Sequence, residues 1–556
     1  MNPRASLQVP PGRLSKWKPI AAATLLAVAL ALGGRFLSGH APSPQRDAPL
    51  IVLRRGNGPE PESLDPHAAR SESALTLLRD LFEGLTAVGV DGAPVLAAAD
   101  AVAVSADGRT YRFHLRPGAR WSNGDAVVAE DFAAAWRRLV DPHTGAQYAD
   151  ILSPVRGAVA ITKGTAPPVS LGVQAESAAT LVVELARPTP YFLGVLSHPA
   201  TFPINRGSLA SQGRGFAKPG VLVSNGAFVL TRWDFGSHLV AARNRRYWND
   251  SATRLDGVEY YSFSNAATEL AAFRTGQVDV TATIPAAQFG WIKQHLGSAL
   301  HVAPQLAVYY LGLNLRKPPF DKSPELRRAL SLVIDRERLV QSVTGGGEAP
   351  AYTFVPPQTS GYAPALPDYA ARPMPERVAR AKQLLREAGM EVHPPTLELR
   401  YNSGELHTRI AIAVAQMWKD SLDIDTTLRA EEFKVLLQDI DRSDVMVFRA
   451  SWVGDYDDAY SFLQVLRGGF GINTPRYLNA AYDELLDRAS NDGDVAQRQR
   501  LLQGAEALML ADQPVIPLYF YVSKHLVNAN IDGWKDNAMN VVYSKNLVKT
   551  VAGGGQ

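Results

Sequence analysis

Short strand-like segments alternate with amphipathic helical segments along nearly the whole of this 556-residue chain, and they follow no fixed repeat. The strand candidates are rich in β-branched and aromatic residues and are bounded by Gly, Pro or Asn. Such interleaving predicts mixed α/β lobes with layered sheets and argues against solenoids and propellers. The strand candidates are Leu50–Leu53, Thr110–Leu115, Leu181–Leu185, Phe228–Thr231, Val258–Phe263, Val278–Thr283, Leu397–Tyr401, Val445–Phe448 and Val515–Val522.

Helix signals are clearest in the second half of the chain. Apolar residues repeat at spacings of three and four over 376–388, and Gly389 marks the end of that helix. Asn402 is the predicted N-cap of a second helix and Asp494 of a third, which Pro514 ends. These patterns fix a fold class without fixing a function.

Composition excludes several classes of protein. The chain contains no cysteine, so disulfides, thiolate catalysis, zinc–thiolate sites and iron–sulfur clusters are excluded. Its 57 basic and 54 acidic residues nearly cancel, so there is no charge footprint for nucleic-acid binding.

Enzyme motifs are absent as well. The sequence has no Gly-x-Ser-x-Gly elbow, no His-Glu-x-x-His pair, no phosphate loop and no dinucleotide fingerprint. The acidic run at Asp455, Asp457 and Asp458 lacks the glycine and glutamate of a calcium loop. We therefore predict no catalytic residues, no metal site and no cofactor, although a hydrolase with two facing carboxylates stays open.

The N-terminus resembles an export signal. Basic residues precede the apolar run Ile20–Leu32, which is short for a membrane span. Residues 1–41 are thus either a signal peptide or an uncleaved N-terminal anchor, and 42–49 form a linker. Removing 1–41 would lower the formal net charge from +3 to −2.

The segment most suggestive of ligand binding follows one strand candidate. Val445–Phe448 leads into Arg449, then Trp452, then Asp455. A basic group, a large aromatic ring and an acid at a strand end would suit a zwitterionic ligand. Taken alone, the same segment is better explained by a strand followed by a solvated acidic loop.

Short motifs in a fixed order carry a resemblance to a known family. The chain resembles the extracytoplasmic oligopeptide-binding proteins of ABC importers, the family 5 solute-binding proteins, from about residue 50 to 550. The matching motifs are Ser63–His67, Arg79–Leu85, Tyr111–Arg116, Trp121–Gly124, Ser224–Phe228, Lys317–Phe320, Trp452–Tyr456, Val515–Tyr521 and Lys545–Leu547.

The resemblance implies a two-lobed periplasmic-binding-protein fold of type II, an α/β fold with an additional inserted domain and a hinge between the lobes. Lobe I would combine residues 50–73, 205–306 and 523–550, with the inserted domain at 74–204. Lobe II would be 307–522. Two crossing strands, near 305–309 and 519–523, would form the hinge.

The resemblance also implies roles for individual residues. Asp455 would pair with the α-amino group of a bound peptide, and Arg449 and His407 would lie toward its C-terminal end. Glu60 would hydrogen-bond the ligand backbone, as would Ser451 to Val453. Aromatic side chains would line the cleft: Trp452, Tyr148, Tyr309, Tyr310 and Phe433.

Three features depart from the family pattern. Several members carry a disulfide between the positions of Ala307 and Val453, and both cysteines are missing here. An aromatic position that is often Trp is Phe433, and a basic group ahead of Arg449 is displaced to Arg442. These departures leave the preferred peptide length open.

The implied function is an exported, periplasmic, monomeric receptor that encloses short peptides and delivers them to the permease and ATPase of an inner-membrane ABC transporter. Murein peptides or a non-peptide solute are alternative ligands. A tethered peptide sensor without a transporter is a further alternative, which an uncleaved N-terminal segment would favour.

Overall fold

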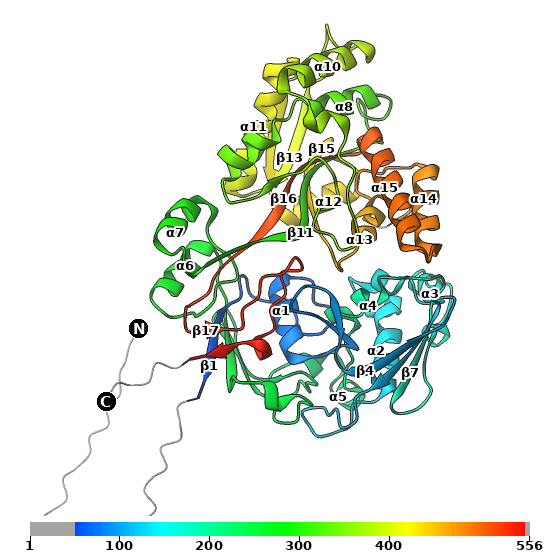
Figure 1. Ribbon diagram of the computed structural model, residues 1–556, viewed down its shortest axis with the longest axis vertical. Coiled ribbons are helices and arrows are strands. Elements are labelled where there is room, and N and C mark those ends of the chain that lie inside the picture. Colours follow the sequence, from blue (N-terminus) through cyan, green and yellow to red (C-terminus); the bar gives the residue numbers. More distant parts are fainter. Residues whose placement is uncertain (1–49, 471, 551–556) are drawn as a thin grey trace, which may run out of the picture. The chain divides into compact units, whose positions relative to one another are not determined.

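The computed structural model describes residues 50–470 and 472–550 (Figure 1). The predicted signal or anchor segment and the linker at 42–49 lie outside these residues. None of the helices in the described part of the chain is both long enough and apolar enough to cross a membrane.

The residues predicted for lobe I hold a four-stranded sheet in the order β1-β10-β9-β8. Strand β1 (Val52–Gly56) runs parallel to β10 (Gly257–Tyr261), and β9 (His238–Arg243) and β8 (Phe228–Asp234) continue the sheet antiparallel. The helices of this region are α1 (Glu72–Leu81), α5 (Arg206–Gln212), α6 (Ala266–Arg274) and α7 (Phe289–His295). The smaller strand pairs are β2 (Thr86–Val88) with β3 (Pro94–Leu96) and β17 (Ile531–Asp532) with β18 (Val548–Lys549).

The segment predicted as the inserted domain holds its own antiparallel sheet, in the order β4-β5-β7-β6. Its core is built around two fully buried tryptophans, Trp121 and Trp136, whose indole N–H groups donate to Asp131 and to the Thr201 carbonyl. The elements are β4 (Ala99–Val104), β5 (Thr110–Leu115), β6 (Val173–Ala175), β7 (Thr180–Glu184), α2 (Ala129–Val140), α3 (Ala158–Thr162) and α4 (Phe192–Val195).

The residues predicted for lobe II hold a six-stranded sheet in the order β12-β16-β11-β15-β13-β14. Its strands are β11 (Leu300–Leu313), β12 (Ala349–Pro350), β13 (Leu397–Asn402), β14 (Thr426–Glu431), β15 (Val447–Val453) and β16 (Val515–Leu526). Its helices are α8 (Pro324–Leu332), α9 (Arg336–Arg338), α10 (Met374–Glu387), α11 (Glu405–Leu422), α12 (Phe433–Asp441), α13 (Ala459–Leu463), α14 (Ala480–Asn491) and α15 (Val495–Asp512).

Strands β11 and β16 are the long connection between the two regions, and Figure 1 shows them running side by side away from α6 and α7. Their pairing is interrupted between Pro304 and Val308, where proline cannot donate to the ladder. At the lower end an isolated bridge joins Val280 to Val527. The hinge predicted near 305–309 would therefore coincide with a break in the register of this strand pair.

Two sequence predictions were wrong in detail. Val278–Thr283 is not a strand, because only Val280 pairs, once with Arg55 and once with Val527. Asn402 is not a helix cap, because it is the last residue of β13 and α11 begins at Glu405. By contrast, Asp494 caps α15 as expected, since its carboxylate accepts the Gln497 N–H at 2.7 Å.

Candidate functional site

Strand β15 carries the predicted binding segment and has one open edge. It pairs with β11 along its whole length but with β13 only at Val447 and Phe448. The Gly454 N–H donates to the Leu306 carbonyl at 2.8 Å, which sets the alternation of the ladder. The backbone groups of Arg449, Ser451 and Val453 consequently face away from β11, toward the open edge. An extended ligand can add there as a further strand.

Arg449 lies at one end of this edge without a carboxylate partner in the described part of the chain. Its guanidinium donates to Asn402 Oδ1 at 3.2 Å and to Tyr521 Oη at 3.0 Å, and it lies 4.8 Å from the centroid of the Tyr309 ring. Its Nε is buried without a hydrogen-bond partner. A half-buried cation with a free donor and only neutral neighbours is well placed to receive an anionic group.

His407 lies beside this cation, in the first turn of α11. Its Nδ1 is 3.4 Å from Tyr309 Oη. Burial, and to a lesser degree the charge of Arg449, lowers the pKa of His407 to about 4. The imidazole is thus neutral at pH 7, and Arg449 supplies the positive charge at this end.

Asp455 lies just beyond the other end of β15. Its backbone N–H donates to Ser461 Oγ at 3.0 Å, but among the described residues its carboxylate has no ion pair or hydrogen bond. The residue keeps partial solvent access, yet its surroundings desolvate the carboxyl enough to raise its pKa to about 7. An ammonium group brought beside it would restore the ionised form.

Two of the predicted aromatic residues, Trp452 and Tyr148, lie in the neighbourhood of this acid. The Trp452 indole N–H donates to the Ser461 carbonyl at 2.9 Å and is half-buried. Tyr148, from the predicted inserted domain, packs against His198 with ring centroids 4.6 Å apart and ring planes inclined by 45°. Burial raises the pKa of Tyr148, and the nearby Asp455 charge adds to that rise.

Glu60 extends the site to the loop after β1. Its Oε1 accepts the Trp233 indole N–H at 2.5 Å, whereas Oε2 is buried without a partner. An unpaired buried carboxylate oxygen can accept a donor from a ligand. The Trp233 contact was not expected from the sequence.

Three predicted residues differ in their surroundings. Tyr309 is buried and stacks on Tyr519, 4.8 Å away, so it supports Arg449 from within the sheet. Tyr310 is also buried and packs edge-on against Phe354, which makes it a core residue. Phe433 begins α12 with its side chain 49% exposed, and no described contact joins it to Arg449 or Asp455.

Sequence reasoning missed the residues that hold Arg449 in place. Asn402 and Tyr521 both bond its guanidinium, from β13 and β16 respectively. The alternation of Tyr519 and Tyr521 in one strand was a usable signal, because residues two apart share a face of a sheet. Asn402 had been assigned to a helix cap.

The inserted domain and lobe II touch beside the acidic end of the site. The Tyr191 ring stacks on Tyr456 at 4.8 Å and on Tyr460 at 5.2 Å. Arg187 donates to Tyr460 Oη at 3.1 Å, and Asp458 forms two hydrogen bonds with Arg498. Asp458 therefore has an internal partner, and no group of three or more candidate ligands for a metal ion occurs within residues 50–470 and 472–550.

Comparison with known proteins identifies the family to which this chain belongs. The sequence model of the protein family described as "Bacterial extracellular solute-binding proteins, family 5 Middle" matches residues 93–474. The chain belongs to family 5 of the bacterial extracellular solute-binding proteins. Membership makes it a binding receptor and not an enzyme, and it confirms the two-lobed α/β fold predicted from the sequence.

Three relatives of this family 5 receptor are named for different ligands. It is 37% identical to the probable deoxycholate-binding periplasmic protein YgiS of Escherichia coli, over 94% of this chain and 98% of the relative. It is 34% identical to the periplasmic oligopeptide-binding protein OppA of the same organism, over 95% and 98%. The structure of the E. coli murein tripeptide binding protein MppA superposes with a TM-score of 0.82 at 34% identity, covering 90% of this chain and 99% of that one.

The positions of the missing family disulfide can be located in the structure. Ala307 and Val453 are direct cross-strand partners on β11 and β15. The two positions where several family 5 members carry a disulfide thus face each other here without one.

Proposed function

We propose that this family 5 receptor encloses short peptides between its two lobes and delivers them to an ABC-type import permease. The observation that carries the proposal is the open edge of β15, which has an unpaired cation at one end and an unpaired acid at the other. Strand addition takes affinity from the peptide backbone, which all sequences share. The two terminal charges then fix direction and register.

The site residues have distinct roles in this proposal. Asp455 binds the α-amino group, and Arg449 binds the C-terminal carboxylate, with His407 beside it. The backbone of Ser451 and Val453 pairs with the peptide, and Glu60 accepts a donor from the opposite side. Trp452 and Tyr148 line the cleft.

The deciding experiment is a calorimetric titration of one tripeptide in three forms: free, N-acetylated and C-amidated. Acetylation removes the ammonium opposite Asp455, and amidation removes the carboxylate opposite Arg449. Losing one partner of an enclosed charge pair typically costs about 2–5 kcal/mol, so each blocked form should bind at least roughly tenfold more weakly. Equal affinity for all three forms would contradict the proposal.

The named relatives supply the alternative ligands. A murein tripeptide and deoxycholate belong in the same titration, because MppA and YgiS are named for such solutes. Deoxycholate has a carboxylate but no amine, so it could use Arg449 and leave Asp455 unpaired. Tight binding of deoxycholate without any peptide binding would favour the non-peptide alternative.

The proposed setting is the periplasm, with the receptor acting as a monomer. Several relatives are named as periplasmic proteins. Mass spectrometry of the exported protein would show whether residues 1–41 are removed or retained as an anchor. Native mass spectrometry of freshly purified protein would identify any retained ligand and the oligomeric state in one measurement.

A further inference from the structure

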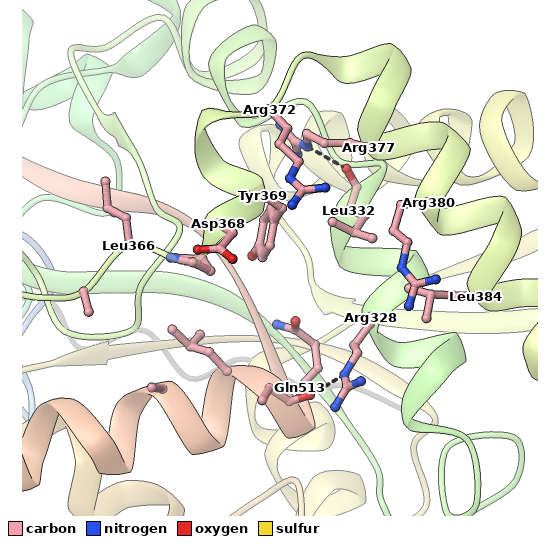
Figure 2. A pocket seen from close by; sticks show the side chains of 15 residues that line it. Arg328, Leu332, Leu366, Asp368, Tyr369, Arg372, Arg377, Arg380, Leu384 and Gln513 are labelled. Atoms are coloured by element: carbon pink, nitrogen blue, oxygen red, sulfur yellow. Dashed lines mark hydrogen bonds between the residues drawn. The ribbon is translucent and has the colours of Figure 1, made fainter.

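A second cavity lies within lobe II, apart from the peptide site. It has a volume of about 400 Å³ and is formed by α8, the segment 365–372, α10 and the C-terminal end of α15 (Figure 2). None of the residues assigned to peptide binding lines it. Its size falls in the range usual for small-molecule sites.

The floor of this cavity is apolar. Leu332, Leu384 and Leu510 are buried side chains that line it, from α8, α10 and α15. Leu366 stands at the rim with 66% of its side chain exposed, and Ala507 is also exposed. A ligand with an apolar body would remove this surface from water.

Four arginines line the cavity against the single carboxylate of Asp368; Arg328, Arg372 and Arg380 are accessible to solvent, whereas Arg377 is buried. In Figure 2, Arg372 and Tyr369 lie on one side, and Arg328 with Gln513 lies opposite. The remaining cations, Arg377 and Arg380, project from α10.

Most of these cations have no acidic partner in the described part of the chain. Arg372 has neither an ion pair nor a side-chain hydrogen bond, and Arg328 bonds only the neutral Ala511 carbonyl, at 2.6 Å. Arg377 donates to the Leu332 and Ile334 carbonyls, and only Arg380 reaches a carboxylate, that of Glu387 at 3.0 Å.

A neutral donor adds to the cationic ones. Tyr369 lines the same cavity, and its phenolic oxygen is buried without a hydrogen-bond partner. Uncompensated guanidinium groups around an apolar floor match a molecule with an apolar body and an anionic head, because Arg binds planar oxyanions through paired hydrogen bonds.

We propose that this cavity is a second ligand site, for a small amphipathic anion whose head is a carboxylate or a sulfonate. It differs from the peptide site in needing no amine and no extended backbone. It also lies within one lobe, so occupancy does not require the lobes to close.

The test uses 8-anilinonaphthalene-1-sulfonate, whose fluorescence rises in apolar surroundings, on the full-length protein saturated with tripeptide. We expect one bound probe per chain, displaced by decanoate and at least fivefold less effectively by decanol. Decanol displacing the probe as well as decanoate does would overturn the anionic specificity. A probe that binds the peptide-free protein but no longer binds once the protein is saturated with tripeptide would lie in the peptide cleft and overturn the proposal.

Two variants test the charge of the cavity and its volume separately. Arg372→Gln removes an exposed cation that bonds nothing, so the fold should survive while probe affinity falls about three- to tenfold. Arg386→Gln is the control, because Arg386 lies exposed on α10, the helix that follows Arg372 in the chain, pairs with Glu391 and does not line the cavity. Ala507→Trp fills the cavity without changing charge and should abolish binding. Unchanged probe affinity in Ala507→Trp, with a wild-type melting temperature, would show that the probe does not bind in this cavity.

Discussion

The ring of Tyr191 lies flat against the ring of Tyr456, with centroids 4.8 Å apart and planes inclined by 1°. The first residue belongs to the predicted inserted domain and the second follows Asp455 in lobe II. Closure of the receptor is thus supported by a direct contact between protein groups, next to the carboxylate proposed to hold the peptide amine.

Replacing Tyr191 by Ala should weaken the closed state. Aromatic pairs contribute about 0.5–1.5 kcal/mol beyond the area they bury, so peptide affinity should fall roughly two- to tenfold. The loss should appear as faster dissociation in stopped-flow measurements, with a larger radius of gyration in solution scattering. Tyr191→Phe keeps the ring and should stay within about twofold of wild type; an equal loss in Phe and Ala would show that the stack is not the cause.

The facing positions Ala307 and Val453 offer a second test. By the alternation that the Gly454 bond sets, they form a non-hydrogen-bonded pair, whose Cα atoms typically lie about 4.5 Å apart, within the range for a disulfide. The double variant Ala307→Cys with Val453→Cys should therefore oxidise readily and gain about 2–4 kcal/mol of unfolding free energy. Denaturation with and without reductant measures the gain, and either single cysteine variant is the control. No difference between oxidised and reduced forms would contradict this register.

Much of the fold follows from local sequence, but the site does not. Strand β5 has the predicted bounds, and the Asp494 cap was correct, because alternation and capping act over a few residues. Strand β11 was not among the strand candidates from local pattern, since Pro304 interrupts it. Its long pairing with β16 arises only in the folded chain.

The contacts that shape the site join residues far apart in sequence. Arg187 and Tyr460, for example, are 273 positions apart. No local pattern encodes such a contact, so the family resemblance was needed to add Tyr148 to the local hypothesis that already joined Arg449 and Asp455. The same limit explains why Asn402 was assigned to a cap: its role at Arg449 depends on the neighbouring strand.

The charge of Asp455 can be tested against the ligand directly. Asp455→Asn should weaken binding of a free tripeptide at least roughly tenfold, at the low end of the cost of breaking an enclosed pair. Its effect on an N-acetylated tripeptide should be small, because the amine is already absent. The melting temperature should not fall, since the carboxylate bonds nothing in the described part of the chain. Equal losses for both peptides would show that Asp455 acts on the fold rather than on the amine.

Peptide affinity should depend on pH through the same group. Desolvation raises the pKa of Asp455 to about 7 in the free receptor, and a bound ammonium lowers it, so binding releases a proton below pH 7. Affinity should weaken above about pH 8, where the peptide ammonium loses its proton, and on the acid side it should fall by up to tenfold per unit between pH 6.5 and 5. Calorimetry in buffers of different ionisation enthalpy counts the released proton. Asp455→Asn should remove this dependence, and a wild-type affinity that stays flat down to pH 5 would contradict the desolvated state.

Glu506 predicts a pH effect on stability rather than on binding. Burial raises its pKa to about 7, although its Oε1 accepts the Phe354 and Val355 N–H groups and its Oε2 accepts the Tyr362 hydroxyl. A folded-state pKa above the unfolded value means that the carboxyl's favourable contribution is present at low pH and lost as pH rises through 7.

Glu506→Gln should therefore be more stable than wild type at pH 8 and show no such advantage at pH 5.5. The amide oxygen can still accept the two backbone N–H groups, whereas Glu506→Ala leaves them unpaired and should lower the melting temperature at both values. Thermal unfolding of the three proteins across this range makes the comparison. If Glu506→Gln is no more stable than wild type at pH 8, the carboxyl group of Glu506 is not desolvated in the way that its burial between α15 and the 354–362 segment implies.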